Sequence, residues 1–168
     1  MLWLDRENPD KEIQLYVNSP GGEIYPGLAI YDTMQMLRAP LSTIAVGWTA
    51  SMGTVLLAAG QKGRRYALPH ATIHMHPAGG GARGYAPDVE IQYKELKRMQ
   101  DLLHNVLAKH TGQTVEKIAE DFDRDFFMDP EQAVEYGLID EVLSLDEEQA
   151  GADEQEEAAE KESAEAEA

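Results

Sequence analysis

Five serines are the candidate nucleophiles of this chain, because it contains no cysteine that could serve instead. Ser51 is the serine best placed for chemistry. It follows an apolar segment and Gly47, and the small residues Ala50 and Gly53 flank it, so a substrate backbone could approach closely. A serine at the start of a helix also lies beside unpaired N–H groups and the positive end of the helix dipole, which favour a developing oxyanion. The plainer interpretation, that Ser51 only caps its helix, fits this position equally well.

Two of the five histidines alternate along one expected strand. Side chains in a strand repeat every two residues, so His74 and His76 point to the same side. A base on this strand could reach Ser51 if the two strands are neighbours. A His-x-His pair also resembles part of a metal site, but no nearby acid or third histidine completes it, so a metal is the weaker alternative. The histidines of the long expected helix, His104 and His110, are predicted to lie at the surface.

The acid that would orient such a base is expected within a short acidic segment that contains Asp121, Asp123, Asp125 and Asp129. Asp125 precedes the apolar run 126–128, and a carboxylate beside such a run is expected to be partly buried, as an orienting acid requires. The alternative is a solvated acidic loop with one helix cap. Spacing alone does not choose among the four.

These side chains depend on alternating strands and helices. Alternating apolar residues and short apolar runs predict strands at residues 12–18, 41–46, 64–68, 72–76 and 138–143. Helical spacing of apolar residues, with caps, prolines and glycines at the ends, predicts helices at residues 26–37, 51–59, 87–109, 114–122 and 130–137. Strands that alternate with helices indicate an α/β fold.

Charge is concentrated at the carboxyl-terminal end. The net charge is −17, of which residues 146–168, with 11 acids and one lysine, contribute −10 and residues 1–145 contribute −7. We therefore expect one folded domain at 1–145 and a disordered acidic tail at 146–168. The acidic balance argues against nucleic acid or an anionic membrane as partner. The sequence has no apolar run long enough for a membrane helix and lacks the features of a signal peptide, which predicts a cytoplasmic protein.

Six segments, in order over residues 8–143, resemble the proteolytic subunits of the Clp proteases, the ClpP family. They are LYVNSPGG (15–22), AIYDTMQ (29–35), GWTASMG (47–53), GQKGRRY (60–66), HTGQ (110–113), and DRD (123–125) followed by AVEYGL (133–138). Each is weak alone, but six in the same order make a specific resemblance.

The resemblance implies an α/β chain with the crotonase-like ClpP fold, built from repeated β-β-α units, and a Ser-His-Asp endopeptidase. It assigns Ser51 as the nucleophile, His76 as the base and Asp125 as the acid that orients the base. By the same resemblance, the backbone N–H groups of Gly22 and Met52 form the oxyanion hole. Glycine at this turn allows the backbone to direct an N–H towards the substrate carbonyl.

Further positions follow from the same resemblance. Gly21, Ile24, Gly79 and Gly80 are expected to bind substrate, and residues 79–85 match the strand beside the bound peptide. The helix at 87–109 corresponds to the handle between two rings. Asp123 and Arg124 match a pair that links the rings to the catalytic acid, although an ordinary surface ion pair is the alternative.

The resemblance also implies partners. The family forms heptameric rings, stacked as a double ring with the active sites inside, and a AAA+ unfoldase of the Clp type feeds unfolded proteins into it. No cofactor or metal is expected in this chain, because ATP is used by the partner ATPase.

Three departures from the family pattern stand out. Relatives have about fifty more residues before the segment that matches Met1, which would include the pore loop, a helix and a strand, so an uncovered strand edge and apolar patch are expected. The family's His-Gln-Pro-x-Gly-Gly is replaced by His76-Pro77-Ala78-Gly79-Gly80, which removes a backbone donor after the base and leaves His74 as the competing base. The acidic tail is an addition.

Two other functions are alternatives. The absence of the residues that relatives have before Met1 favours a weakly active or structural subunit of a mixed ring. The presence of Ser, His and Asp at all three triad positions argues against it. An acyl-CoA enzyme of the wider crotonase group shares the fold but has no use for a Ser-His-Asp triad.

Overall fold

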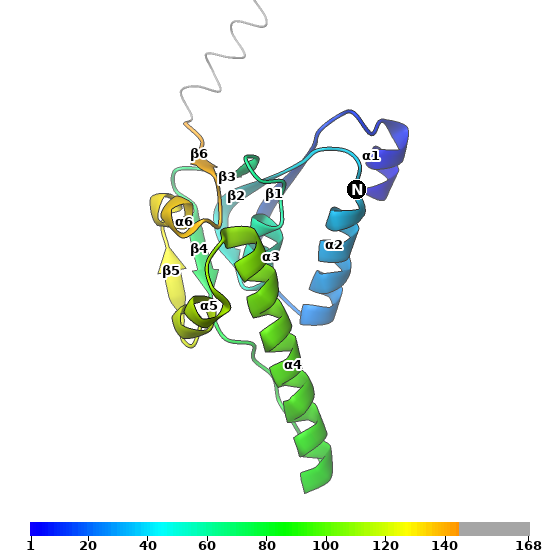
Figure 1. The fold of residues 1–168 in the computed structure, drawn as a ribbon, viewed down its shortest axis with the longest axis vertical. Helices are drawn as coiled ribbons and strands as arrows, with labels where there is room; N and C mark the ends of the chain where they lie inside the picture. The colour runs from blue at the N-terminus through cyan, green and yellow to red at the C-terminus, as the bar shows by residue number, and fades with distance from the viewer. Residues whose placement is uncertain (145–168) are drawn as a thin grey trace, which may run out of the picture.

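A mixed sheet forms the centre of the computed structural model, which describes residues 1–144; the predicted acidic tail lies outside the described residues. Strand β2 (Leu41–Ala50) pairs in parallel with three others, β6 adds in parallel to β3, and β5 pairs antiparallel with β4 (Figure 1). The remaining strands are β1 (Ile13–Ser19), β3 (Arg65–Ala67), β4 (Thr72–Met75), β5 (Phe126–Met128) and β6 (Glu141–Val142). The α/β class is confirmed.

Three strands pair in parallel with β2, one along one edge and two along the other. β1 lies along one edge, where Ile13 pairs with Leu41. Along the other edge β3 pairs with the first half of β2 and β4 with the end, where Ala50 lies opposite His74. The end of β2 and the strand that carries the histidines are therefore neighbours, as the serine–histidine hypothesis requires.

The helices of the described residues cover this sheet. They are α1 (Leu2–Glu7), α2 (Ile24–Met36), α3 (Met52–Ala58), α4 (Ala86–Thr111), α5 (Val115–Asp121) and α6 (Pro130–Tyr136). The larger core cluster packs α3 between the sheet and the second half of α4, and its members Leu57, Ile73, Leu107 and Leu138 are almost fully buried. A second cluster packs α2 on β1. Burial of each large apolar side chain contributes about 1.5–3 kcal/mol.

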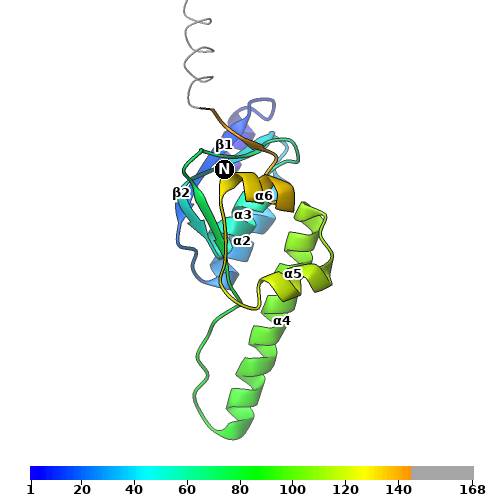
Figure 2. The same cartoon turned by 90° about the vertical axis from the view of Figure 1, so that its left-hand side faces the viewer.

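Helix α4 is the longest helix, with 26 residues. Its second half joins the core, and its first half projects from the body with the 77–85 segment beside it (Figures 1 and 2). A pair of hydrogen bonds between Gln92 and the backbone of Arg83 ties this segment to the helix. Within residues 1–144, no helix is long and apolar enough to cross a membrane.

Local signals for helix ends are confirmed. The Thr114 hydroxyl accepts a hydrogen bond from the Lys117 N–H at the start of α5. Asp129 and Gln132 form a reciprocal capping box at the start of α6. Such caps satisfy N–H groups that have no partner inside the helix, which explains why both boundaries could be predicted from sequence.

Other boundaries differ from the predictions. Strand β2 does not stop at residue 46 but continues through Gly47, whose φ of 64° allows a bulge, to Ala50. The last strand is shorter than predicted and contains only Glu141 and Val142. Helix α1 and strand β5 were not predicted, because both are short and their apolar residues show no clear period.

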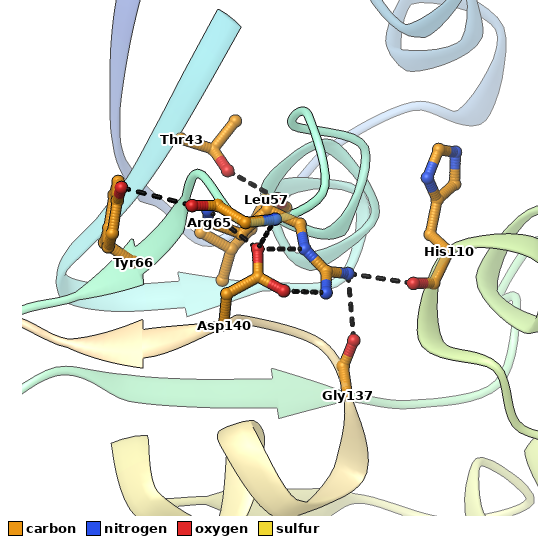
Figure 3. A network of polar contacts seen from close by, with 8 residues as sticks. Thr43, Leu57, Arg65, Tyr66, His110, Gly137 and Asp140 are labelled. Atoms are coloured by element: carbon orange, nitrogen blue, oxygen red, sulfur yellow. Dashed lines mark hydrogen bonds and ion pairs between the residues drawn. The ribbon is translucent and has the colours of Figure 1, made fainter.

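A buried arginine joins the carboxyl-terminal segments to the sheet. The Arg65 guanidinium, at the start of β3, donates to both carboxylate oxygens of Asp140 and to the carbonyl oxygens of His110 and Gly137 (Figure 3). It thus contacts the end of α4, the end of α6 and the turn before β6. Burial alone would raise the pKa of Asp140, but the hydrogen bonds and charge of Arg65 outweigh it and hold that pKa below its usual value of 3.8.

This network generates a stability prediction. Asp140→Asn leaves the buried Arg65 charge without its anion, so the free energy of unfolding should fall by about 3 kcal/mol at pH 7. A carboxylate with a lowered pKa stabilises the fold above its unfolded pKa, and the stabilisation is lost as pH falls through its folded pKa. The difference in free energy of unfolding between wild type and Asp140→Asn, measured by urea denaturation, should therefore be constant above pH 5 and become smaller below about pH 4.

The matched control is Asp123→Asn, since Asp123 forms an ion pair with Arg124 in which both side chains are largely exposed. Its denaturation curve should stay close to that of wild type at every pH. Equal effects of the two substitutions would contradict the role given to Arg65.

Candidate active site

Ser51 joins the end of β2 to the start of α3. Among residues 1–144 it is the one non-glycine residue with a positive φ, at 54° with ψ of −122°. Such a conformation costs about 1–3 kcal/mol and persists only where the surroundings impose it. The Ser51 N–H donates to the carbonyl of His74, 2.9 Å away, and its carbonyl accepts from Thr54 and Val55. Its side chain makes no capping hydrogen bond to α3, so the plainer interpretation of Ser51 as a simple cap is wrong.

The loop after β1 packs directly on this serine. A Cβ added to Gly21 would lie 2.5 Å from the Ser51 Cβ and 2.8 Å from the Ala50 carbonyl oxygen. No side chain fits there, and the φ of 93° also favours glycine. The Gly21 N–H donates to the Ser19 hydroxyl, 3.1 Å away, which fixes the turn. A Cβ on Gly22, in contrast, would meet nothing within 4 Å, so open space borders this residue.

The first residue of α3 completes this side of the site. The backbone nitrogen of Met52 would lie 3.1 Å from a Cβ on Gly21, and its N–H belongs to the first turn of the helix, where it has no intrahelical partner. The Met52 side chain is buried against Gly27 of α2. Ile24 packs on the larger core cluster, to which Met52 belongs. The structure therefore brings Gly21, Met52 and Ser51 together.

His74 is held tightly in β4. Its ring stacks on Phe127 of β5, with centroids 4.1 Å apart and planes at 11°, and more loosely on Trp48 of β2, at 6.3 Å and 26°. It is 8% exposed. Its Nε2 lies 3.1 Å from Oδ1 of Asp125. The sequence indicates His74 only as the competing base or as part of a weaker metal alternative, and neither aromatic neighbour could be predicted, because strand β5 itself was not.

His76 follows the end of β4 and is partly exposed. Its Nδ1 lies 2.7 Å from the Pro77 carbonyl oxygen. A carbonyl can only accept, so Nδ1 carries the hydrogen and Nε2 keeps a lone pair. This is the tautomer that a general base acting through Nε2 needs. The rings of His74 and His76 lie 5.5 Å apart.

Asp125 lies directly before β5. In the structure it bonds to His74 and not to His76, so its role as the acid for His76 stays a prediction. The β4–β5 register pairs Met75 with Phe126, and one further step of this antiparallel register sets Asp125 opposite His76. The expectation that Asp125 is partly buried is wrong: its side chain is 69% exposed, because it lies in the turn before β5 and only Met128 of the following apolar run is buried.

The other residues expected to bind substrate lie on the 77–85 segment. Residues 79–85 form no strand, contrary to the expectation for them, and run beside α4 (Figure 2). A Cβ on Gly80 would contact Leu96 of α4 at 3.6 Å, whereas one on Gly79 would meet nothing within 4 Å. The segment is thus supported from one side by the helix.

The prediction that His104 and His110 lie at the surface is wrong. His104 is buried, and burial lowers its pKa. His110 is partly buried, and its Nε2 lies 3.0 Å from the Tyr31 hydroxyl. Burial, and then the charges of Lys109 and Arg65, lower the pKa of His110 to about 4, so it is neutral at pH 7 and belongs to the structural network of Arg65.

Asp123 and Arg124 form an ion pair of 2.9 Å with both side chains largely exposed. Their expected role in linking the rings stays a prediction. In the described part of the chain, no group of three or more histidines and acids is arranged to hold a metal ion, and His74 with His76 and Asp125 makes no such group.

Comparison with known proteins identifies the family of this chain. The model of the Clp protease family matches residues 1–146. Curated relatives include the ATP-dependent Clp protease proteolytic subunits of Dehalococcoides mccartyi strains BAV1, CBDB1 and 195. Each is 64% identical over 143 residues, which cover 85% of this chain and 72% of the relative. The chain therefore belongs to the Clp protease family.

Proposed function

We propose that this chain is a serine endopeptidase that hydrolyses peptides and unfolded proteins as the proteolytic subunit of a Clp-type assembly. The observation that carries this proposal is the backbone of Ser51, held at positive φ with its side chain free of the helix cap and with Gly21 packed against it. Membership of the Clp protease family and the names of the relatives support the same activity.

In the proposed mechanism the Ser51 hydroxyl attacks the peptide carbonyl, and His76 Nε2 takes the hydroxyl proton. The tautomer of His76, with Nδ1–H on the Pro77 carbonyl, supports this role. His76 then gives the proton to the leaving amine. Water, activated by the same nitrogen, hydrolyses the acyl-enzyme and regenerates Ser51.

The charge that develops on the substrate oxygen would be stabilised by the N–H groups of Gly22 and Met52. Open space at Gly22 and the unpaired first turn of α3 support this oxyanion hole. Asp125 would supply the negative charge that stabilises protonated His76, and the β4–β5 register supports that pairing. Gly21, Ile24, Gly79 and Gly80 remain the proposed substrate-binding positions.

Assembly is part of the proposal. We propose heptameric rings, stacked in pairs and served by a AAA+ unfoldase, as for other members of this family. The projecting half of α4 supports contact with further subunits, because it exposes the apolar side chains of Val89, Ile91 and Tyr93.

The nucleophile gives the direct test. Ser51→Ala should abolish labelling by a fluorophosphonate probe and lower peptide hydrolysis by roughly 10⁴-fold or more, because no other group can form the acyl-enzyme. The matched control is Ser144→Ala, which removes a hydroxyl from the end of the described chain and should label like wild type. Labelling of Ser51→Ala, or no labelling of the assembled wild type, would contradict the proposal.

The glycine against Ser51 gives a second test. Gly21→Ala should lower kcat/KM by about 100-fold, because the new methyl must displace either Ser51 or the loop that carries an oxyanion donor. Gly63→Ala is the control: its φ is 82°, but a Cβ there meets nothing within 4 Å. Both carry the strain of a positive φ, and Gly21→Ala adds the clash with Ser51 and Ala50, so its melting temperature should fall further and only Gly21→Ala should lose activity. Near-normal activity of Gly21→Ala would refute the contact.

A further inference from the structure

Two aromatic rings hold the His74 side chain in place, in addition to its burial in the fold. It lies between the rings of Trp48 and Phe127, which belong to the two strands on either side of β4. These two contacts fix the plane of the imidazole, and its position in the ladder opposite Phe127 fixes the backbone. Both ring nitrogens therefore have set directions.

The two nitrogens of His74 have different surroundings. Within the described residues, Nδ1 is buried and has no hydrogen-bond partner. Nε2 lies 3.1 Å from Oδ1 of Asp125, which as a carboxylate can only accept. Nε2 must therefore carry the hydrogen. A hydrogen on Nδ1 as well would bury a charged ring with an unsatisfied donor, which is costly. His74 is thus a neutral ring that donates through Nε2.

The Asp125 carboxylate is held in place by this donor. Its side chain is 69% exposed, it lies in the turn between α5 and β5, and the bond to His74 is the hydrogen bond that holds its carboxylate in the described structure. A carboxylate has two oxygens, so Oδ1 on His74 leaves Oδ2 available to a second donor. His76 follows His74 by two residues, and its ring centroid lies 5.5 Å from that of His74.

We propose that His74 is a positioning residue for the catalytic triad: its Nε2–H holds Asp125 through one oxygen so that the other oxygen can accept from Nδ1–H of His76. His76 would then exchange the Pro77 carbonyl for the Asp125 carboxylate during turnover. The inference rests on the proposed function, in which His76 is the base.

The test is a set of variants of the full chain in its assembled form. His74→Phe keeps an aromatic ring between Trp48 and Phe127 but has no donor, and it should lower kcat for a fluorogenic peptide by about ten- to hundredfold with little change in KM. His74→Gln places an amide N–H near the position of Nε2 and should recover part of that loss. His70→Phe, at an exposed position of the preceding loop, is the control and should behave like wild type.

A double-mutant cycle separates positioning from general packing. In an Asp125→Ala background the change from His74 to Phe should have no further effect on kcat, because the group that it positions is gone. An equal loss with and without Asp125 would overturn the proposal, as would an unchanged or higher kcat in His74→Phe. A higher kcat would mean that His74 withdraws the acid from His76.

A measurement without turnover keeps the inference distinct from the proposed function. Nitrogen-15 NMR of the Ser51→Ala protein should show His74 as the Nε2–H tautomer, with a signal that moves in Asp125→Ala. A hydrogen on Nδ1 would overturn the proposal even if His74→Phe failed to assemble. Failure of the wild type to label with fluorophosphonate, with the His74 tautomer as stated, would instead count against the proposed function.

Discussion

The Arg65 guanidinium is the interaction on which the carboxyl-terminal third of the fold depends. It contacts the points at which the chain leaves α4, leaves α6 and enters β6. A Cβ on Gly137 would lie 2.3 Å from the Thr111 carbonyl oxygen, so the ends of α4 and α6 meet without room for a side chain. A planar group with five donors can serve the four acceptor oxygens at this crossing, whereas the three donors of a lysine cannot. Its burial is tolerable because every contact supplies a carbonyl or carboxylate oxygen.

The candidate site depends on the segment whose two ends Arg65 holds in place. Between His110 and Gly137 the chain makes α5, the turn with Asp125 and strand β5, and β5 then pairs with the strand that carries the histidines. The proposed nucleophile and oxyanion donors come from a different part of the molecule, the β1 and β2 ends and α3. The two halves of the site are thus built on one sheet and meet at the β2–β4 pair, and Met52 of α3, Met75 of β4 and Met128 of β5 belong to the same core cluster.

Much of this arrangement could be predicted from the sequence. The caps at Thr114 and Asp129, the αL glycines at Gly112 and Gly137, and the turn at Gly21, which the Ser19 hydroxyl fixes, act through neighbouring residues, so local patterns reveal them. The partners of His74 could not be predicted, because Trp48 and Phe127 are far apart in sequence and β5 has only three residues. The same holds for the buried state of His110, which depends on Tyr31 across the fold. Periodicity shows which side of an element is buried, but not against what.

His76 has one hydrogen-bond partner in the structure, the Pro77 carbonyl, and one proposed partner, the Asp125 carboxylate. The first is local in sequence and the second is distant. The Pro77 carbonyl is one residue away, so it selects the tautomer that His76 needs as the proposed base without help from the rest of the fold. A neutral carbonyl, however, stabilises a protonated imidazole far less than a carboxylate does. The stronger partner, Asp125, lies across a strand pair and stays near His76 only while β5 is in register and the carboxylate is held. The tautomer of the base is therefore a local property, while its stabilisation in the charged state depends on tertiary structure that Arg65 and β5 maintain.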